Sequence, residues 1–308
     1  MTGGEAAALI TSLLWAMTSL FFTQATARVG PAIVNKTRLL LALVLLACSH
    51  FVVFHTLLPI GAGWERWSWL ALSGVIGLII GDALLFQAFN VVGPRLSMLL
   101  MSLAPVITTI FSWIFLNEQL TSIQLAGILI TVAGIAFVAA ERGVKLETTV
   151  EQPSAGRERE IPVRIKGILF GLGGATGQAL GLVTSKLGLA GDFPALSGNL
   201  IRVLVAATIL WAWTIVRGRV PLTWSALRRD RSAIGYIAAG SVVGPFLGIW
   251  FSLIAIQHAE VGVASTLMGL APIILLPLSR IFLHEKISWK AVLGTCVAMF
   301  GVSVLFLA

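Results

Sequence analysis

Charged residues are scarce in this sequence, and their scarcity excludes an ordinary soluble domain. Only 11% of the 308 residues are Asp, Glu, Lys or Arg, whereas 57% are hydrophobic. A soluble domain carries roughly a quarter charged residues, so this chain cannot cover itself with polar surface. Its mean hydropathy of +0.96 indicates a protein dissolved in lipid. Because each spanning helix needs about 20 apolar residues, the length predicts roughly ten spans.

Reactive side chains are also few. The two cysteines, Cys48 and Cys296, lie in apolar runs, form no metal-binding pattern and do not indicate a disulfide. The four histidines lack metal-ligand spacing, and no Ser/His/Asp or Cys/His set converges on one side. The sequence has no Walker loop, so ATP is not expected to supply energy. We therefore expect neither an enzyme nor a protein that needs a metal or cofactor.

The apolar sequence divides into ten runs separated by polar turns. No Lys or Arg precedes the first run, which argues against a cleaved signal peptide, so this run is interpreted as a permanent helix. The predicted spans are 5–25, 32–56, 67–90, 94–116, 121–141, 165–187, 194–216, 232–257, 261–283 and 288–307.

The two halves of the chain share a duplicated motif. Leu103-Ala104-Pro105 recurs as Leu270-Ala271-Pro272, at an offset of 167 that continues without a gap. A weaker match, at an offset of 164, relates Asn35-x-x-Arg38 to Asn199-x-x-Arg202. We interpret the chain as two five-helix repeats, 1–141 and 165–308, joined by a charged linker at 142–164. The first offset also relates Gly77 to Gly244, Gly81 to Gly248, Glu118 to Glu285, and Gly134 to Gly301.

An odd number of spans in each half makes the two repeats enter the membrane from opposite sides. Nearly all of the 21 Lys and Arg residues fall in loops or helix ends on one side, Arg38 among them. Since basic loops are cytoplasmic, both termini are predicted to lie outside. This topology explains the net charge of +8 without a nucleic-acid partner. Inverted repeats are typical of secondary transporters.

Small residues and prolines predict where helices approach and bend. Pro105 and Pro272 each remove a backbone hydrogen bond in mid-span, and we assign this symmetric pair a gating role. Small residues four apart predict close packing, which is either static or a surface on which helices slide. These ridges are Ser73, Gly77 and Gly81; Gly173, Gly177 and Gly181; and Gly240, Gly244 and Gly248.

Asp82 is the most informative polar residue, because an ionisable group inside a span faces a cavity or a partner. It either binds a substrate ammonium, exchanges a proton, or forms a salt bridge with Arg38. Glu118 is expected to be hydrated or to accept hydrogen bonds from backbone N–H groups of the next helix, and Thr121-x-x-Gln124 predicts a capping box. The other candidate substrate-binding residues, each with a core or lipid-facing alternative, are Trp15, Phe86, Met98, Met101, Gln178, Trp250 and Met268.

The duplicated segments, Ala88 to Gly134 and Ala255 to Gly301, resemble the EamA repeat of the drug/metabolite transporter superfamily. The resemblance is carried by Leu103-Ala104-Pro105, Phe115-Leu116-x-Glu118, Thr121 and Gly127…Gly134, and by their second copies. Glycine commonly precedes the glutamate in that family, whereas this chain has Asn117 or His284. The resemblance implies an all-α membrane protein of ten helices in two inverted repeats, alternating access at a central cavity, and solute export.

We therefore expect a secondary transporter of the bacterial inner membrane that exports small amphipathic metabolites, with neutral or aromatic amino acids favoured. Phosphorylated substrates would need a pair of deep basic residues, and only Arg202 is a candidate. The alternatives are a proton-coupled multidrug exporter that uses Asp82, and a membrane binding or receptor protein without transport. The expected partners are a small-molecule substrate and the lipid bilayer, and the fused duplication predicts a monomer.

Overall fold

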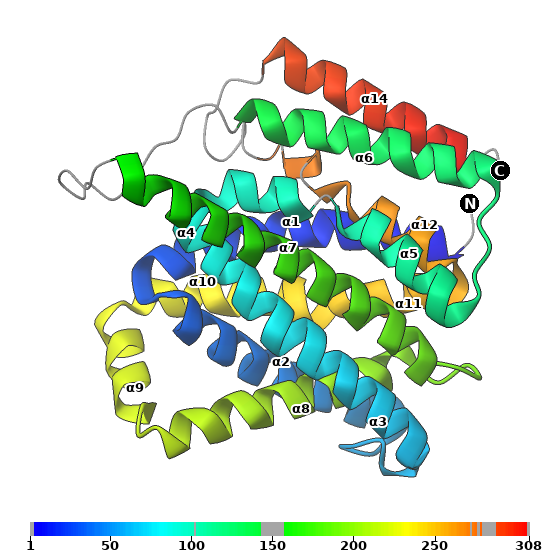
Figure 1. Ribbon diagram of the computed structural model, residues 1–308. Helices are drawn as coiled ribbons and strands as arrows, with labels where there is room; N and C mark the ends of the chain where they lie inside the picture. Colours follow the sequence, from blue (N-terminus) through cyan, green and yellow to red (C-terminus); the bar gives the residue numbers. More distant parts are fainter. Residues whose placement is uncertain are drawn as a thin grey trace.

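The computed structural model describes residues 3–101, 103–142, 157–271, 273–275, 278 and 288–306. Within these ranges the chain is helical and contains no strand. The helices form one bundle, in which the start of α1 and the end of α14 lie at the same end (Figure 1). The structure confirms the predicted all-α architecture.

The first half contains five helical stretches, and the third is divided by a π-helical segment. Its elements are α1 (Gly3–Val29), α2 (Pro31–Phe54), η1 (Ile60–Ala62), α3 (Gly63–Ser73), η2 (Gly74–Gly81), α4 (Asp82–Met101), α5 (Ala104–Leu116) and α6 (Ser122–Arg142). Between α1 and α2, Gly30 adopts a φ of 82°, which favours glycine, and Pro31 then starts α2.

The second half repeats this order, with an added short helix α9 in its basic loop. Its elements are α7 (Arg157–Gly188), α8 (Ala195–Val216), α9 (Val220–Arg229), α10 (Arg231–Ser241), η3 (Val242–Gly248), α11 (Ile249–His258), α12 (Val261–Met268) and α14 (Trp289–Phe306). Helix α7 begins inside the segment that was predicted to be the linker.

Within the part of the chain that the structure describes, six helical stretches are long and apolar enough to cross a membrane. Shorter apolar helices lie at the remaining positions where spans are predicted, so the count of ten stays a prediction. The long stretches are Gly3–Val29, Pro31–Phe54, Ile60–Ala88, Ile165–Gly188, Ala195–Val216 and Arg231–His258, and the shorter ones are Ala104–Leu116, Ser122–Phe137, Val261–Leu275 and Val292–Val304.

The break between the third and fourth predicted spans is in a different place from the prediction. Helix α4 continues through 91–93, and the helical order is interrupted near Leu103 instead. Pro105 is the second residue of α5, where its missing N–H costs no intrahelical hydrogen bond. It therefore starts a helix and does not bend one, which corrects the mid-span prediction. Its counterpart Pro272 lies outside the described residues.

The two repeats carry π-helical segments at matching positions. Segment η2 covers Gly74–Gly81, and η3 covers Val242–Gly248. The offset of 167 maps one segment onto the other within one residue. In η3, Pro245 cannot donate a backbone hydrogen bond, which favours this irregular winding. Wide turns of this kind often mark functional positions in helices.

Glycines on these segments permit close contact with the first helix of the other repeat. A Cβ added at Gly177 of α7 would lie 2.6 Å from the Cα atom of Gly81, and one at Gly181 would lie 3.1 Å from that of Gly77. Helix α1 packs in the same way on η3, where a Cβ at Gly248 would lie 2.9 Å from the Trp15 ring. The predicted glycine ridges are thus confirmed as sites of close helix packing.

Helices α6 and α14 pair along one edge of the bundle (Figure 1). A Cβ at Gly134 would collide with the backbone of Ala298, and one at Gly301 would collide with Thr131. The Thr131 hydroxyl donates to the Gly127 carbonyl at 2.8 Å, within its own helix. Gly134 and Gly301, which the offset of 167 relates, thus both lie at the contact between α6 and α14.

The α7–η2 contact gives a test of close packing. Gly177→Ala inserts a methyl group against the Gly81 backbone, and overpacking of this kind costs about 1–3 kcal/mol. We expect a lower unfolding midpoint in detergent, measured by thermal or denaturant titration. Gly235→Ala is the matched control, because a Cβ there meets open space. Equal midpoints for the two variants would contradict the packing argument.

Candidate functional site

A buried ion pair joins α2 to the start of α4. The guanidinium of Arg38 donates through Nη2 to the Asp82 carboxylate, and both side chains are largely shielded, with 6% and 16% exposed. Arg38 also donates through Nε and Nη2 to Asn35 Oδ1, at 3.0 and 2.9 Å. Of the alternatives for Asp82, the structure contains the salt bridge to Arg38.

Two aromatic rings enclose the same guanidinium. The Cζ atom of Arg38 lies 5.5 Å from the ring centre of Phe22 and 5.4 Å from that of Phe86. These rings meet edge to face at 86°, with centres 6.5 Å apart. A cation over an aromatic face is attracted by the ring. Arg38 is therefore held by the Asp82 carboxylate, the Asn35 amide oxygen and the rings of Phe22 and Phe86.

The burial of Arg38 corrects the prediction that it lies at an exposed helix end. The residue is 5% exposed, in the second turn of α2, and its neighbour Lys36 is also buried. The deep part of the fold therefore contains two arginines, Arg38 and Arg202, and not one.

The second repeat contains the matching residues, Asn199 and Arg202, but their side chains form different hydrogen bonds from those of Asn35 and Arg38. The Asn199 amide donates to the carbonyls of Pro245 and Phe246 in η3, at 3.0 and 3.3 Å. Arg202 is 4% exposed, and its charge interacts with that of Asp82. Among the described residues, Asn199 Oδ1 and the Nε and Nη1 atoms of Arg202 find no hydrogen-bond partner.

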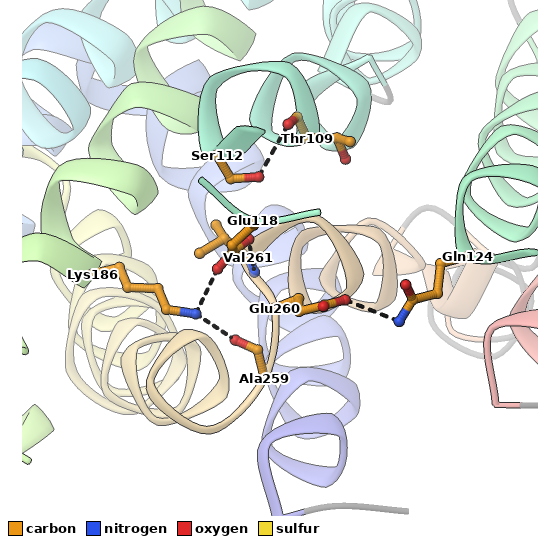
Figure 2. Close-up of polar contacts among 8 residues, drawn as sticks. All are labelled: Thr109, Ser112, Glu118, Gln124, Lys186, Ala259, Glu260 and Val261. Atoms are coloured by element: carbon orange, nitrogen blue, oxygen red, sulfur yellow. Dashed lines mark hydrogen bonds and ion pairs between the residues drawn. The ribbon is translucent and has the colours of Figure 1, made fainter. Parts of the chain in front are cut away.

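A second polar group lies where the end of α7 meets the turn between α11 and α12 (Figure 2). Lys186 at the end of α7 forms an ion pair with Glu118 at 2.7 Å and donates to the Ala259 carbonyl at 2.9 Å. The other oxygen of Glu118 accepts from the backbone N–H of Val261, at the start of α12, at 3.0 Å. We call these four residues the polar clasp, since they join the two repeats.

Local backbone geometry positions the clasp. Asn117 ends α5 with a φ of 53°, a left-handed conformation that asparagine tolerates. Thr121 and Gln124 exchange backbone and side-chain hydrogen bonds of 2.8 and 3.1 Å, which confirms the capping box. Glu118 accepts from the N-terminus of α12 in the other repeat and not from that of the next helix, α6, which corrects the predicted partner.

Glu260 borders the clasp between α11 and α12. Its carboxylate accepts from Gln124 at 3.0 Å (Figure 2). Partial burial raises the pKa of Glu260, and the nearby charge of Glu118 raises it further, while Lys186 and Gln124 act in the opposite direction. The negative charges of Glu118 and Glu260 therefore repel each other, which favours the protonated form of Glu260.

The predicted site residues do not form one group. Asp82 and Phe86 both contact Arg38. Met268 is buried in the larger apolar core, against which Trp15 and Trp250 pack, whereas Phe86 belongs to a separate apolar cluster with Phe22. The Trp250 ring lies 6.1 Å from that of Phe246 on η3.

Three further predicted residues lie on helices that flank the same region. Gln178 is half-buried on α7, next to the contact between Gly177 and η2. Met101 is the half-buried last residue of α4. Met98 is on the same helix, but its side chain lies outside what the structure describes.

The apolar groove between η2 and α8 contains none of the predicted site residues. It has a volume of about 540 Å³ and is lined by Ile79, Ile209, Leu210, Ala212, Trp213 and Val216. Trp213 and Val216 are 58% and 81% exposed, so this groove belongs to the apolar outer surface.

Sequence reasoning named Arg38 as a possible partner of Asp82 but missed Phe22, Asn199 and Lys186 as members of these groups. One signal was present, because the Asn-x-x-Arg motif occurs in both repeats. Polar residues that recur at matching positions inside spans point to a shared internal role. Nothing in the sequence indicated the pairing of Lys186 with Glu118, which are 68 residues apart.

A comparison with models of protein families shows to which family the chain belongs. The model described as "EamA-like transporter family" matches residues 2–140 and 165–307, once for each repeat. The chain belongs to this family. EamA membership confirms the resemblance found in the sequence and makes the chain a multi-pass membrane transporter.

Two individual proteins are similar to this EamA chain. "Uncharacterized transporter YvbV" from Bacillus subtilis (strain 168) is 25% identical over 233 residues, which cover 75% of this chain and 68% of the relative. A solved protein crystal structure superposes with a TM-score of 0.76 at 17% identity, and the match covers 99% of this chain and 96% of the other. At that identity the second match supports the fold alone.

The Arg38–Asp82 pair makes a quantitative prediction for this EamA protein. Arg38→Gln leaves a shielded carboxylate without its partner, which costs about 3–5 kcal/mol, whereas the double change Arg38→Leu and Asp82→Leu restores most of the loss. Denaturant unfolding in detergent measures both. The control is Arg28→Gln, which breaks an exposed ion pair with Asp230 and is expected to change stability much less, because water screens exposed charges. Equal losses for Arg38→Gln and Arg28→Gln would contradict the assignment.

Glu260 makes a prediction about pH. Its pKa is raised above the ordinary value of 4.5, so its contribution to stability is present below that value and is lost as the pH rises through the raised pKa. Glu260→Gln removes the charge and keeps a polar group beside Gln124. We expect the variant to unfold at a higher temperature than the parent at neutral pH, and at the same temperature at about pH 4. Glu65→Gln, at an exposed carboxylate, is the control. A Glu260→Gln difference that does not depend on pH would refute the interpretation.

Proposed function

We propose that this chain is a secondary transporter of the bacterial inner membrane that exports small amphipathic metabolites by alternating access. Neutral or aromatic amino acids are the favoured solutes. The observation that carries the proposal is the inverted pair of contacts in which α7 packs on η2 and α1 packs on η3. Each contact joins the first helix of one repeat to the π-helical segment of the other.

These contacts suit a movement between two states. Backbones that meet through glycine carry few interlocking side chains, so one helix can shift along the other at low cost. The polar clasp ties the same helix α7 to α5 and α12 at one end of the bundle. Release of the clasp would open that end, and its formation would close it.

The interior offers both parts that an amphipathic solute needs. Trp15, Phe246 and Trp250 supply apolar and aromatic surface against the core. The Arg38–Asp82 pair and Arg202 supply buried polar groups nearby on α2, α4 and α8. Ligand sites are mostly apolar with a few placed polar groups, which is the composition found here.

Counterflow in proteoliposomes tests the function directly. Vesicles that contain the full chain are preloaded with one unlabelled solute from a panel, and uptake of labelled neutral and aromatic amino acids is followed. Saturable exchange of one class is the expected result. Uptake of lipophilic cations under a pH gradient, lost in Asp82→Asn, would instead identify a proton-coupled multidrug exporter. Binding without flux of any solute would identify a receptor.

Movement at the α7 contact has its own test. Ser73 on α3 and Ser185 on α7 have hydroxyl oxygens 2.6 Å apart, so a cysteine pair there can form a disulfide. With Cys48 and Cys296 replaced by serine, oxidation of Ser73→Cys/Ser185→Cys should stop counterflow, and reduction should restore it. Each single cysteine variant is the control. Unchanged exchange in the oxidised pair would show that this contact is static.

A further inference from the structure

Three buried polar atoms without partners lie within one turn of α8. They are Asn199 Oδ1 and the Nε and Nη1 atoms of Arg202, in residues that are 0% and 4% exposed. A buried donor or acceptor that lacks a partner destabilises the fold, and a charged one does so more strongly. Native proteins retain such unpaired buried atoms where the atoms serve another purpose, such as the binding of a ligand or ion.

The first repeat shows that the same motif can satisfy itself. Asn35 Oδ1 accepts from both Nε and Nη2 of Arg38, and Asp82 takes the remaining charge. In the second repeat Asn199 turns its amide to the carbonyls of η3, which leaves its oxygen and Arg202 unpaired. Asp82 has no counterpart there, because the matching position is Ile249. Arg202 thus lacks both partners that Arg38 has.

Charge balance in this region is also incomplete. Asp82 is paired with Arg38, and among the described residues Arg202 forms no ion pair, so one carboxylate is present for two buried guanidinium groups. A buried charge without compensation is strongly unfavourable, and proteins pair it or bind an ion. One further negative charge at Arg202 would complete the balance.

We infer that Arg202 receives the carboxylate of the transported solute, and that Asn199 Oδ1 accepts a hydrogen bond from the same solute. This inference rests on the proposed transport function and narrows its substrates to compounds with one carboxylate. A neutral amino acid fits both partners, since its carboxylate matches the guanidinium and its ammonium matches the amide oxygen.

A dianionic phosphate fits less well. Dianion recognition favours several cationic donors, but the Nε and Nη2 atoms of Arg38 are already occupied by Asn35 and Asp82. One guanidinium with free N–H groups matches one carboxylate in charge and in donors. The buried pair of arginines therefore does not indicate a phosphorylated substrate.

Arg202 lies against the contact that is proposed to move. A Cβ at Gly77 would lie 3.4 Å from Arg202 Nη2 and 3.7 Å from the Cα atom of Gly181 on α7. No side chain from Gly77 separates the guanidinium from the α7–η2 contact. Because Arg202 is buried in this conformation, the solute reaches it when α7 and η2 separate.

The test compares a carboxylate with its amide. L-phenylalanine and L-phenylalaninamide, which differ at the carboxylate, are added to the purified full chain in detergent, and thermal unfolding is followed. We expect L-phenylalanine alone to raise the unfolding midpoint of the parent. Arg202→Met should weaken its binding about tenfold or more, because hydrogen bonds to a charged group are lost. Arg202→Lys, which keeps the charge without the planar group, should show an intermediate loss.

Arg217→Gln is the matched control, because Arg217 follows α8 and is exposed. It should bind as the parent does. Arg202→Met should also unfold at a higher temperature without ligand, since the change removes an uncompensated buried charge; a structural role would lower that temperature. Equal effects of L-phenylalanine and its amide, or an L-phenylalanine effect that persists in Arg202→Met, would overturn the inference.

Counterflow separates this inference from the transport proposal. Equal exchange of L-phenylalanine and L-phenylalaninamide would support the transport function and refute the Arg202 site. Carboxylate binding that depends on Arg202, without exchange of any solute, would support the site and refute transport. Inhibition of exchange by inorganic phosphate as strong as that by L-phenylalanine would refute the preference for one charge.

Discussion

Close contact between helix backbones is the constraint on which this structure depends. In a bilayer, apolar side chains gain little from leaving lipid, so helices associate through tight packing and hydrogen bonds. Glycines at 77 and 81 meet glycines at 177 and 181, and the equivalent face of η3 receives α1. The first helix of each repeat, α1 or α7, packs on the π-helical segment of the other repeat. Neither half can therefore complete its packing alone. The polar groups are placed by these contacts.

The scaffold is symmetric, but its buried chemistry is not. The Asn-x-x-Arg motif occurs in both repeats, yet Arg38 is fully engaged by Asn35, Asp82 and two aromatic rings, whereas Arg202 is left with free donors. The presence of Asp82 in one repeat alone creates this difference. A duplicated fold can thus retain two matching positions for movement and use one of them for structure and the other for recognition.

The polar clasp shows how a membrane protein can close one end without a large apolar contact. A single lysine on α7 contacts a carboxylate from the first repeat and a carbonyl from the second, and that carboxylate also caps α12. Several weak, partly hydrated interactions of this kind form and break more readily than a packed core. These contacts lie at the end of α7, which also packs on η2, so under the proposed mechanism the clasp and the α7–η2 contact change together.

The sequence by itself determined the features that depend on neighbours within a few residues or on periodicity. These include the helical class, the duplication, the glycine ridges and the capping box at Thr121 and Gln124. Only the tertiary structure decided that Arg38 is buried, that it pairs with Asp82, and that Lys186 meets Glu118. Local rules are set by backbone geometry along one helix, whereas an ion pair between helices depends on their packing and rotation. A motif repeated in the sequence can therefore identify Arg38 and Arg202 as equivalent. It cannot tell which of the two guanidinium groups has N–H donors without hydrogen-bond partners.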